Sequence, residues 1–226
     1  MFIIISYMNF LDTILNVIFP VNCISCGKEG SDLCINCLLD SPPAERESAN
    51  WIFPLFDYRH ISIKKSIWLL KYKNKRKLAG IFAEIMYEKI IEELSELSVM
   101  KNFREPILIP IPLSQKRYRE RGYNQAELIC QELIKINNLR HGVDMKLENN
   151  ILIKIKETEH QANIKNRKDR LKNLSDSFSV KNSELIKGKN IILIDDVTTT
   201  GATLNEAKKI LKQFGAKKII AFTVAH

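Results

Sequence analysis

Near its C-terminus the chain reads Ile191-Ile192-Leu193-Ile194-Asp195-Asp196-Val197-Thr198-Thr199-Thr200-Gly201-Ala202-Thr203. The first four residues are an unbroken apolar run, which is typical of a strand buried on both faces of a parallel sheet. Two carboxylates follow, then a hydroxyl-rich loop, then a helical pattern over 202–214 that Gly215 ends as a C′ residue. Ligands of open α/β sheets bind at the carboxyl ends of strands, so the segment predicts a binding site as well as a strand.

Strands and helices alternate through the C-terminal half of the chain. The residue patterns predict strands at 106–112, 151–155, 178–180 and 219–224, and a helix at 124–136. Upstream, an aromatic stretch covers residues 51–58 and a helical pattern runs from Ile67 to Met86. This alternation indicates an α/β domain with a parallel sheet.

The loop after the apolar run has the composition of a phosphate site. The N–H groups and dipole of a following helix favour an anion, and Gly201 lets the backbone come close to it. Asp195 and Asp196 can accept hydrogen bonds from the vicinal hydroxyls of a ribose, so the segment describes ribose 5-phosphate. Further hydroxyl donors come from Thr198, Thr199, Thr200 and Thr203. The alternative is a threonine helix cap with a solvated aspartate pair.

Other phosphate and aspartate motifs are excluded. The patterns GxxxxGK[ST] and GxGxxG are absent, which removes the Walker P-loop and the dinucleotide fingerprint. A receiver domain needs a later phosphoacceptor aspartate, and no aspartate follows Asp196.

A basic turn follows the predicted strand that ends at Pro112. Arginine forks suit diphosphate oxygens and a lysine adds a point charge, although a solvated charged loop would look the same. The cations are Lys116, Arg117, Arg119 and Arg121.

Two CxxC pairs lie close together near the N-terminus. Four thiolates at this spacing suit a tetrahedral structural Zn²⁺ with no open coordination position, whereas redox pairs or chance are the alternatives. The four are Cys23, Cys26, Cys34 and Cys37; Cys130 stands alone on an apolar helix face and is expected in the core.

The 226 residues carry a formal net charge of +9. That charge fits either a lysine-rich solvated surface or a field that attracts phosphate and nucleic acid. Residues 10–19 have helical apolar spacing, which predicts a short amphipathic helix docked on the protein, with a membrane-surface helix as the alternative. No uncharged stretch approaches the length of a membrane span, so contact with a membrane would be peripheral at most.

The phosphate-loop segment resembles the phosphoribosyl diphosphate loop of type I phosphoribosyltransferases. A second segment, Ile109-Pro110-Ile111-Pro112-Leu113-Ser114-Gln115-Lys116-Arg117-Tyr118-Arg119-Glu120-Arg121-Gly122-Tyr123-Asn124-Gln125, resembles the competence protein F (ComF) family. With the cysteine pairs, the resemblance spans nearly the whole chain. It implies an α/β fold with a type I phosphoribosyltransferase-like parallel sheet flanked by helices, a small N-terminal zinc-ribbon module and a hood.

The resemblance also implies a layout and a set of site residues. An N-terminal helix and zinc knuckle would occupy 1–46, and a phosphoribosyltransferase-like domain 47–226, with the hood and first helix at 47–104 and the core at 105–226. Asp195 and Asp196 would be catalytic, and the basic turn would receive pyrophosphate as its Mg²⁺ complex. Phosphoribosyl diphosphate would contact Thr198, Thr199, Thr200, Gly201, Ala202, Thr203, Lys116, Arg117, Arg119 and Arg121. Tyr123 stands where the family often has Phe, a change that keeps the ring.

Two further segments resemble the family. In the polar stretch 156–175 and just beyond it, Thr158, Gln161, Arg170, Asn173 and Phe178 match a region that forms a mobile lid in type I relatives; a plain connector is the alternative. The other segment is a leucine-lysine-tyrosine sequence with a basic turn. Its possible nucleic-acid contacts are Lys71, Tyr72, Lys73, Lys75 and Arg76, unless these belong to a basic helix that lies over the sheet.

The resemblance implies a cytoplasmic role in natural transformation, on imported single-stranded DNA and beside a DNA-import helicase and channel. An active phosphoribosyltransferase of nucleotide salvage is the alternative. In that enzyme the aspartates would stabilise positive charge near C1 while the basic turn neutralises the leaving group.

Overall fold

The computed structural model describes residues 20–44, 49–155 and 177–226, without the side chains of 98–101. The expected N-terminal helix and four residues of the polar segment, Thr158, Gln161, Arg170 and Asn173, lie outside these ranges. Within the described ranges, no helix is long and apolar enough to cross a membrane. The proposed division at residues 46 and 47 stays a prediction.

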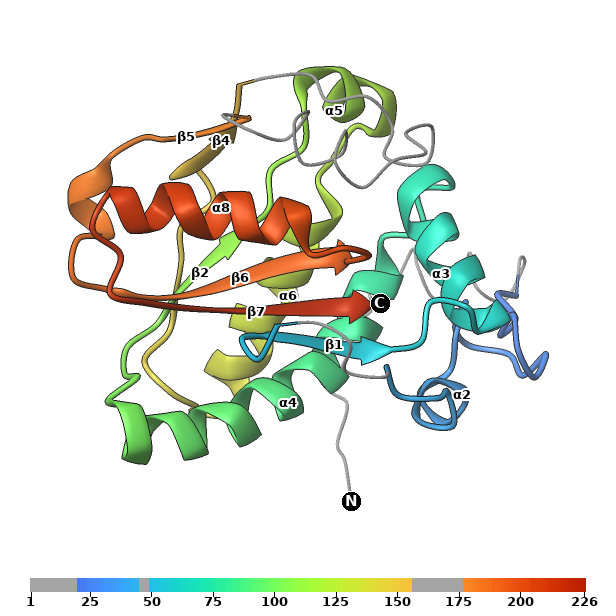
Figure 1. Ribbon diagram of the computed structural model, residues 1–226. Coiled ribbons are helices and arrows are strands. Elements are labelled where there is room, and N and C mark those ends of the chain that lie inside the picture. The colour runs from blue at the N-terminus through green and yellow to red at the C-terminus, as the bar shows by residue number, and fades with distance from the viewer. Residues whose placement is uncertain (1–19, 45–48, 156–176) are drawn as a thin grey trace.

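A five-stranded sheet forms the centre of the molecule, and every neighbouring pair of its strands is parallel (Figure 1). The strands, in spatial order, are β1 (Ile52–Phe56), β7 (Lys218–Ala225), β6 (Asn190–Val197), β2 (Ile107–Pro110) and β3 (Lys146–Leu147). A separate antiparallel ribbon pairs β4 (Leu152–Lys154) with β5 (Phe178–Val180). The helices are α2 (Ile35–Leu39), α3 (Ile61–Tyr72), α4 (Lys77–Lys101), α5 (Gln115–Arg121), α6 (Gln125–Leu139), α8 (Ala202–Gln213) and the 3₁₀ turn Ser183–Leu185.

Alternate residues of β6 pack on opposite faces of the sheet. Ile191 and Leu193 belong to one apolar cluster with residues of α8, whereas Ile192 and Ile194 belong to a second cluster with residues of α3, α4 and α6. All four side chains are fully buried. The unbroken apolar run is therefore explained by helices on both faces, as a parallel sheet requires.

The predicted strands and helices of the C-terminal half are confirmed, although β4 and β5 pair antiparallel outside the five-stranded sheet. Three other details differ from expectation. The aromatic stretch contains an edge strand, β1, which tolerates Pro54 because an edge strand needs fewer ladder hydrogen bonds. The single helical pattern is two helices, α3 and α4, separated by Asn74 in a left-handed conformation (φ 54°). The basic turn is the helix α5, which Ser114 caps by accepting a hydrogen bond from the Arg117 N–H.

Three connections gather at the carboxyl edge of the sheet. The Ile111 N–H donates to the Ile194 carbonyl (2.9 Å), so the chain leaving β2 stays beside β6 up to its aspartate pair. On the other side, the Thr198 N–H donates to the Ala225 carbonyl at the end of β7 (2.9 Å). Helix α3 follows β1 and lies beyond these strand ends (Figure 1). Residues from β2, β6 and α3 therefore meet at one place.

Candidate functional site

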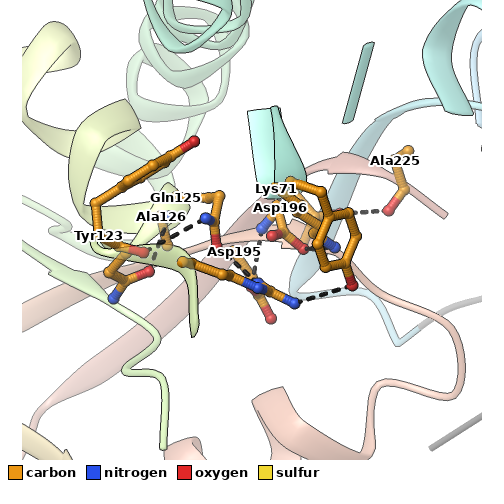
Figure 2. A network of polar contacts seen from close by, with 11 residues as sticks. Lys71, Tyr123, Gln125, Ala126, Asp195, Asp196 and Ala225 are labelled. Carbon is orange, nitrogen blue, oxygen red and sulfur yellow. Dashed lines mark hydrogen bonds and ion pairs between the residues drawn. The ribbon is translucent and has the colours of Figure 1, made fainter. Parts of the chain in front are cut away.

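Two carboxylates lie at the end of β6, and a lysine from α3 neutralises one of them. The Asp196 N–H donates to Asp195 Oδ1 (2.8 Å), and Lys71 Nζ lies 2.7 Å from Asp196 Oδ1 (Figure 2). The Lys71 and Asp196 side chains are only 18% and 11% exposed. The ion pair is thus largely shielded from water, where it is weakened less by salt than a surface pair.

The pKa of Asp195 is raised from 3.8 to about 7. Burial is the main cause, because it disfavours the charged form, and the neighbouring charge of Asp196 acts in the same direction. The Asp196 N–H and the charges of Lys71 and Lys154 act in the opposite direction. At neutral pH this carboxyl can therefore either donate or accept a proton.

The loop between β6 and α8 presents unused backbone donors. Thr198 is buried and its N–H is taken by Ala225, but Thr199 and Thr200 are exposed. Gly201 is the N-cap of α8 with φ 69°, a conformation that glycine adopts without strain. The N–H groups of Thr199, Thr200 and Gly201 donate to no acceptor in residues 20–44, 49–155 or 177–226. Three donors at the start of a twelve-residue helix are therefore available to an anion.

Helix α5 brings the basic residues to the same edge. Lys116 and Arg119 are exposed and Arg117 is half-buried. Arg121 is held in place: it donates to Gln125 Oε1 (2.8 Å) and to the Tyr72 hydroxyl (3.3 Å), and its guanidinium lies 5.1 Å from the centre of the Tyr72 ring. Gln125, which accepts from Arg121, is drawn in the same network as the aspartate pair (Figure 2).

The basic segment after Leu70 divides into residues that make ion pairs and residues that face solvent. Lys71 pairs with Asp196, and Lys75 Nζ lies 3.0 Å from Asp32 Oδ1. Tyr72, Lys73 and Arg76 are exposed; the last lies 4.4 Å from the centre of the Tyr123 ring. Sequence reasoning grouped all of them as possible nucleic-acid contacts, with a basic helix over the sheet as the alternative. It missed the role of Lys71 beside the aspartates, since no spacing rule links α3 to β6.

Tyr123 has a contact that its ring alone does not explain. Its hydroxyl donates to the Leu70 carbonyl in the last turn of α3, and the side chain is buried. Burial raises the pKa of Tyr123, so the hydroxyl keeps its proton. The hydroxyl thus fixes the end of α3 that carries Lys71 and Tyr72. The motif comparison predicted a role for the ring of Tyr123 but none for its hydroxyl.

The four N-terminal cysteines form one cluster. Their Sγ atoms all lie within 4.8 Å of one another, with Cys26 and Cys34 at 3.7 Å. Tetrahedral zinc with Zn–S bonds near 2.3 Å places sulfurs about 3.8 Å apart, so the cluster fits such an ion after small adjustments. The Cys34 N–H also points at Cys23 Sγ (3.4 Å), a contact that favours a thiolate. The predicted ligand set is brought together.

The cluster is packed against the rest of the protein. Leu33 and Leu38, which flank its second cysteine pair, are fully buried in the same apolar cluster as residues of α3 and α4. Asp32 adds the ion pair to Lys75. Loss of a bound metal would therefore affect the connection between α3 and α4.

Comparison with known proteins identifies the family. The model of the phosphoribosyl transferase domain matches residues 150–226, which include the aspartate pair and its loop. Competence protein F of Haemophilus influenzae is 31% identical over 209 residues, which cover 88% of this chain and 83% of that protein. The chain belongs to the competence protein F family. Competence protein ComFC of Streptococcus pneumoniae is also 31% identical, over 204 residues that cover 90% of this chain and 80% of that protein.

A third relative of this ComF-family chain has a different name. DNA utilization protein YhgH of Salmonella typhimurium is 25% identical over 187 residues, which cover 82% of this chain and 74% of that protein. The fold class and the family predicted from the motifs are confirmed. The relatives are named for competence and for DNA utilization, and this chain matches the phosphoribosyltransferase domain model.

Proposed function

We propose that this ComF-family protein binds phosphoribosyl diphosphate at the β6–α8 loop and acts on imported single-stranded DNA in the cytoplasm. One observation supports the first half most strongly: the aspartate pair, a cationic helix and three N–H groups that have no acceptor among the described residues all lie at one edge of the sheet. A sugar that carries a phosphate at one end and a diphosphate at the other offers a partner to each of them.

Each part of the site has a role in this proposal. The 5-phosphate accepts from the N–H groups of Thr199, Thr200 and Gly201 at the start of α8. Asp195 and Asp196 accept hydrogen bonds from the ribose hydroxyls. The threonine hydroxyls and the remaining cations complete the contacts: Thr198, Thr203, Lys116, Arg117, Arg119 and Arg121, with Ala202 contributing backbone. Mg²⁺ enters with the diphosphate and offsets its charge.

The second half of the proposal rests on the names of the relatives and on charge. Relatives are named for competence and DNA utilization, and the chain has a net charge of +9. Cations on the surface attract a polyanion and make binding depend on salt. A DNA-import helicase and a membrane channel are the proposed partners, and Zn²⁺ at the cysteine cluster holds the knuckle together as a structural ion.

The first half is tested by calorimetric titration with Mg²⁺–phosphoribosyl diphosphate. We expect one site per chain, with affinity lost in Asp195→Ala/Asp196→Ala. Lys187→Gln/Lys189→Gln is a matched control, because these exposed lysines flank the opposite end of β6. No heat from the wild type, or equal loss in the control, would count against the site.

The second half is tested with a labelled single-stranded oligonucleotide. We expect the binding constant to fall with salt, with a slope of about −0.7 for each phosphate contacted. Binding that stays constant from low to high salt, or no binding at all, would refute the DNA role while leaving the first half intact.

The alternative function is an active phosphoribosyltransferase of nucleotide salvage. It is favoured by the position of two carboxylates, one largely shielded, where positive charge would develop on the ribose ring. Release of pyrophosphate that depends on an added base would support it. Release that no base stimulates would favour a binding role alone.

A further inference from the structure

Helix α3 has an outward face that meets the site described above only at Tyr72. Ile61, Lys64, Lys65, Trp68 and Tyr72 are all exposed, and their spacing of three or four residues places them along one side of the helix. Trp68 is 46% exposed and Tyr72 is 52% exposed. The opposite side, with Ile63, Ile67 and Leu70, is fully buried. Two large aromatic rings are therefore kept in solvent although the helix is firmly docked.

This face combines aromatic rings with positive charge alone. Helix α3 contains no acidic residue. The Trp68 and Tyr72 rings are 6.2 Å apart, and each has a cation over it: Lys73 Nζ lies 5.3 Å from the Trp68 ring, and the Arg121 guanidinium 5.1 Å from the Tyr72 ring. Rings that alternate with cations are the arrangement by which proteins hold single strands, because every base has a π-face and every link a phosphate.

The face ends at the phosphoribosyl site. Lys71, which precedes Tyr72, bonds Asp196 on β6, and Tyr72 itself contacts Arg121 on α5. Lys71 and Lys75 are thus engaged in ion pairs, so the cations that remain for a ligand on α3 are its outward lysines, Lys64 and Lys65.

We propose that this outward face of α3 is a track for single-stranded nucleic acid, in which bases stack on Trp68 and Tyr72 while phosphates lie against Lys64 and Lys65. The proposal rests on the proposed DNA role and assigns it a surface. The track leads toward the β6–α8 loop, so a strand bound on it lies next to the phosphoribosyl site.

The fluorescence of Trp68 can be used to detect a nucleic acid bound on the track. The other tryptophan, Trp51, is half-buried with Lys208 Nζ 3.9 Å from its ring, and Trp51→Phe leaves Trp68 as the single tryptophan. In this variant, with excitation selective for tryptophan over the tyrosines, we expect a single-stranded oligonucleotide to quench the Trp68 fluorescence. An abasic oligonucleotide of the same length has the phosphates without the bases, so it should bind with little quenching. Free nucleobases, with and without Mg²⁺–phosphoribosyl diphosphate, form a separate arm.

Substitutions measure the two components of the track in the full-length protein. Trp68→Ala should weaken oligonucleotide binding about 5- to 150-fold, which corresponds to about 1–3 kcal/mol for one stacked base. Lys64→Gln/Lys65→Gln should reduce the salt slope by about 0.7 for each lysine. Phe214→Ala is the aromatic control, since this ring is 40% exposed at the far end of α8, and Lys187→Gln/Lys189→Gln is the cationic control.

The outcomes separate this proposal from the one it rests on. If the oligonucleotide binds with salt dependence but Trp68→Ala behaves like Phe214→Ala, the DNA role stands and the track is wrong. Equal quenching by normal and abasic strands, quenching by free bases only, or a change in oligomeric state in Trp68→Ala would each overturn the track. If no strand binds, the DNA role fails as well.

Discussion

Replacing Lys71 with methionine removes the charge beside Asp196 and keeps most of the side-chain length. Opposite charges 2.7 Å apart attract by about 6 kcal/mol at an effective dielectric constant of about 20. Withdrawing both groups from water costs several kcal/mol, and hydrogen bonds to charged groups contribute about 1.5–3 kcal/mol net. We therefore expect Lys71→Met to lower the free energy of unfolding by about 2 kcal/mol, and the melting temperature by about 4–8 °C.

The loss should depend on pH because Asp195 titrates nearby. Its pKa is about 7 in the folded protein and 3.8 ordinarily, so the folded state binds the proton more tightly and stability falls as pH rises between those values. Lys71 holds the pKa of Asp195 down. Without that charge the pKa rises further and the fall in stability continues to higher pH. The difference between Lys71→Met and wild type should therefore be larger near pH 8.5 than near pH 6.

Urea unfolding at the two pH values measures this difference. Lys135→Met is the control, because Lys135 also bonds a carboxylate, Glu132, at 2.6 Å, but its side chain is 65% exposed. A surface pair of this kind contributes less than about 1 kcal/mol. If Lys71→Met costs no more than the control, or if its cost is the same at both pH values, the electrostatic account of the aspartate pair is wrong.

Three more predictions follow from the site. Phosphoribosyl diphosphate should bind more tightly as pH rises through about 7, by at most about tenfold per pH unit, because an ionised Asp195 accepts the ribose hydroxyls. Calorimetry should show that Asp195→Asn lacks this part of the pH profile. A profile identical to that of the wild type would disprove the assignment. Metal analysis should find one Zn²⁺ per chain, and Cys26→Ser should lose this ion together with several kcal/mol of stability. The control variant Cys130→Ala should keep the metal. Zinc retained by Cys26→Ser would contradict the ligand set. Tyr123→Phe should lower the free energy of unfolding by urea by about 1–3 kcal/mol, because it leaves a buried carbonyl without its donor. Tyr118→Phe, at an exposed ring, should change this free energy little. Equal effects would show that the Tyr123 hydroxyl does not stabilise the end of α3.

The sequence was sufficient for the centre of the fold because β6 is buried on both faces. A strand in that position must be apolar in its centre, at Ile191 to Ile194, and its two carboxylates come only near its carboxyl end, at Asp195 and Asp196. The position of the threonine loop and Gly201, between this strand and α8, then followed from the sequence. The cysteine cluster could be predicted equally well, because the spacing of its four metal ligands is local in the chain.

The contacts that these residues make with distant parts of the chain could not be predicted from the sequence. Periodicity shows which side of α3 is buried but not which strand end it faces, so the pairing of Lys71 with Asp196 had no signal in the sequence. The two residues of β3 are too few for any alternation to show. Tyr123 matched its motif through the ring, and only the packing of α3 against it reveals that the hydroxyl has a carbonyl to bond.

The most direct test of the account is a crystal structure of the protein with Mg²⁺–phosphoribosyl diphosphate. The account predicts 5-phosphate oxygens within hydrogen-bond distance of the N–H groups of Thr199, Thr200 and Gly201, and ribose hydroxyls on Asp195 and Asp196. A ligand bound elsewhere, with the β6–α8 loop empty at saturating concentration, would contradict it.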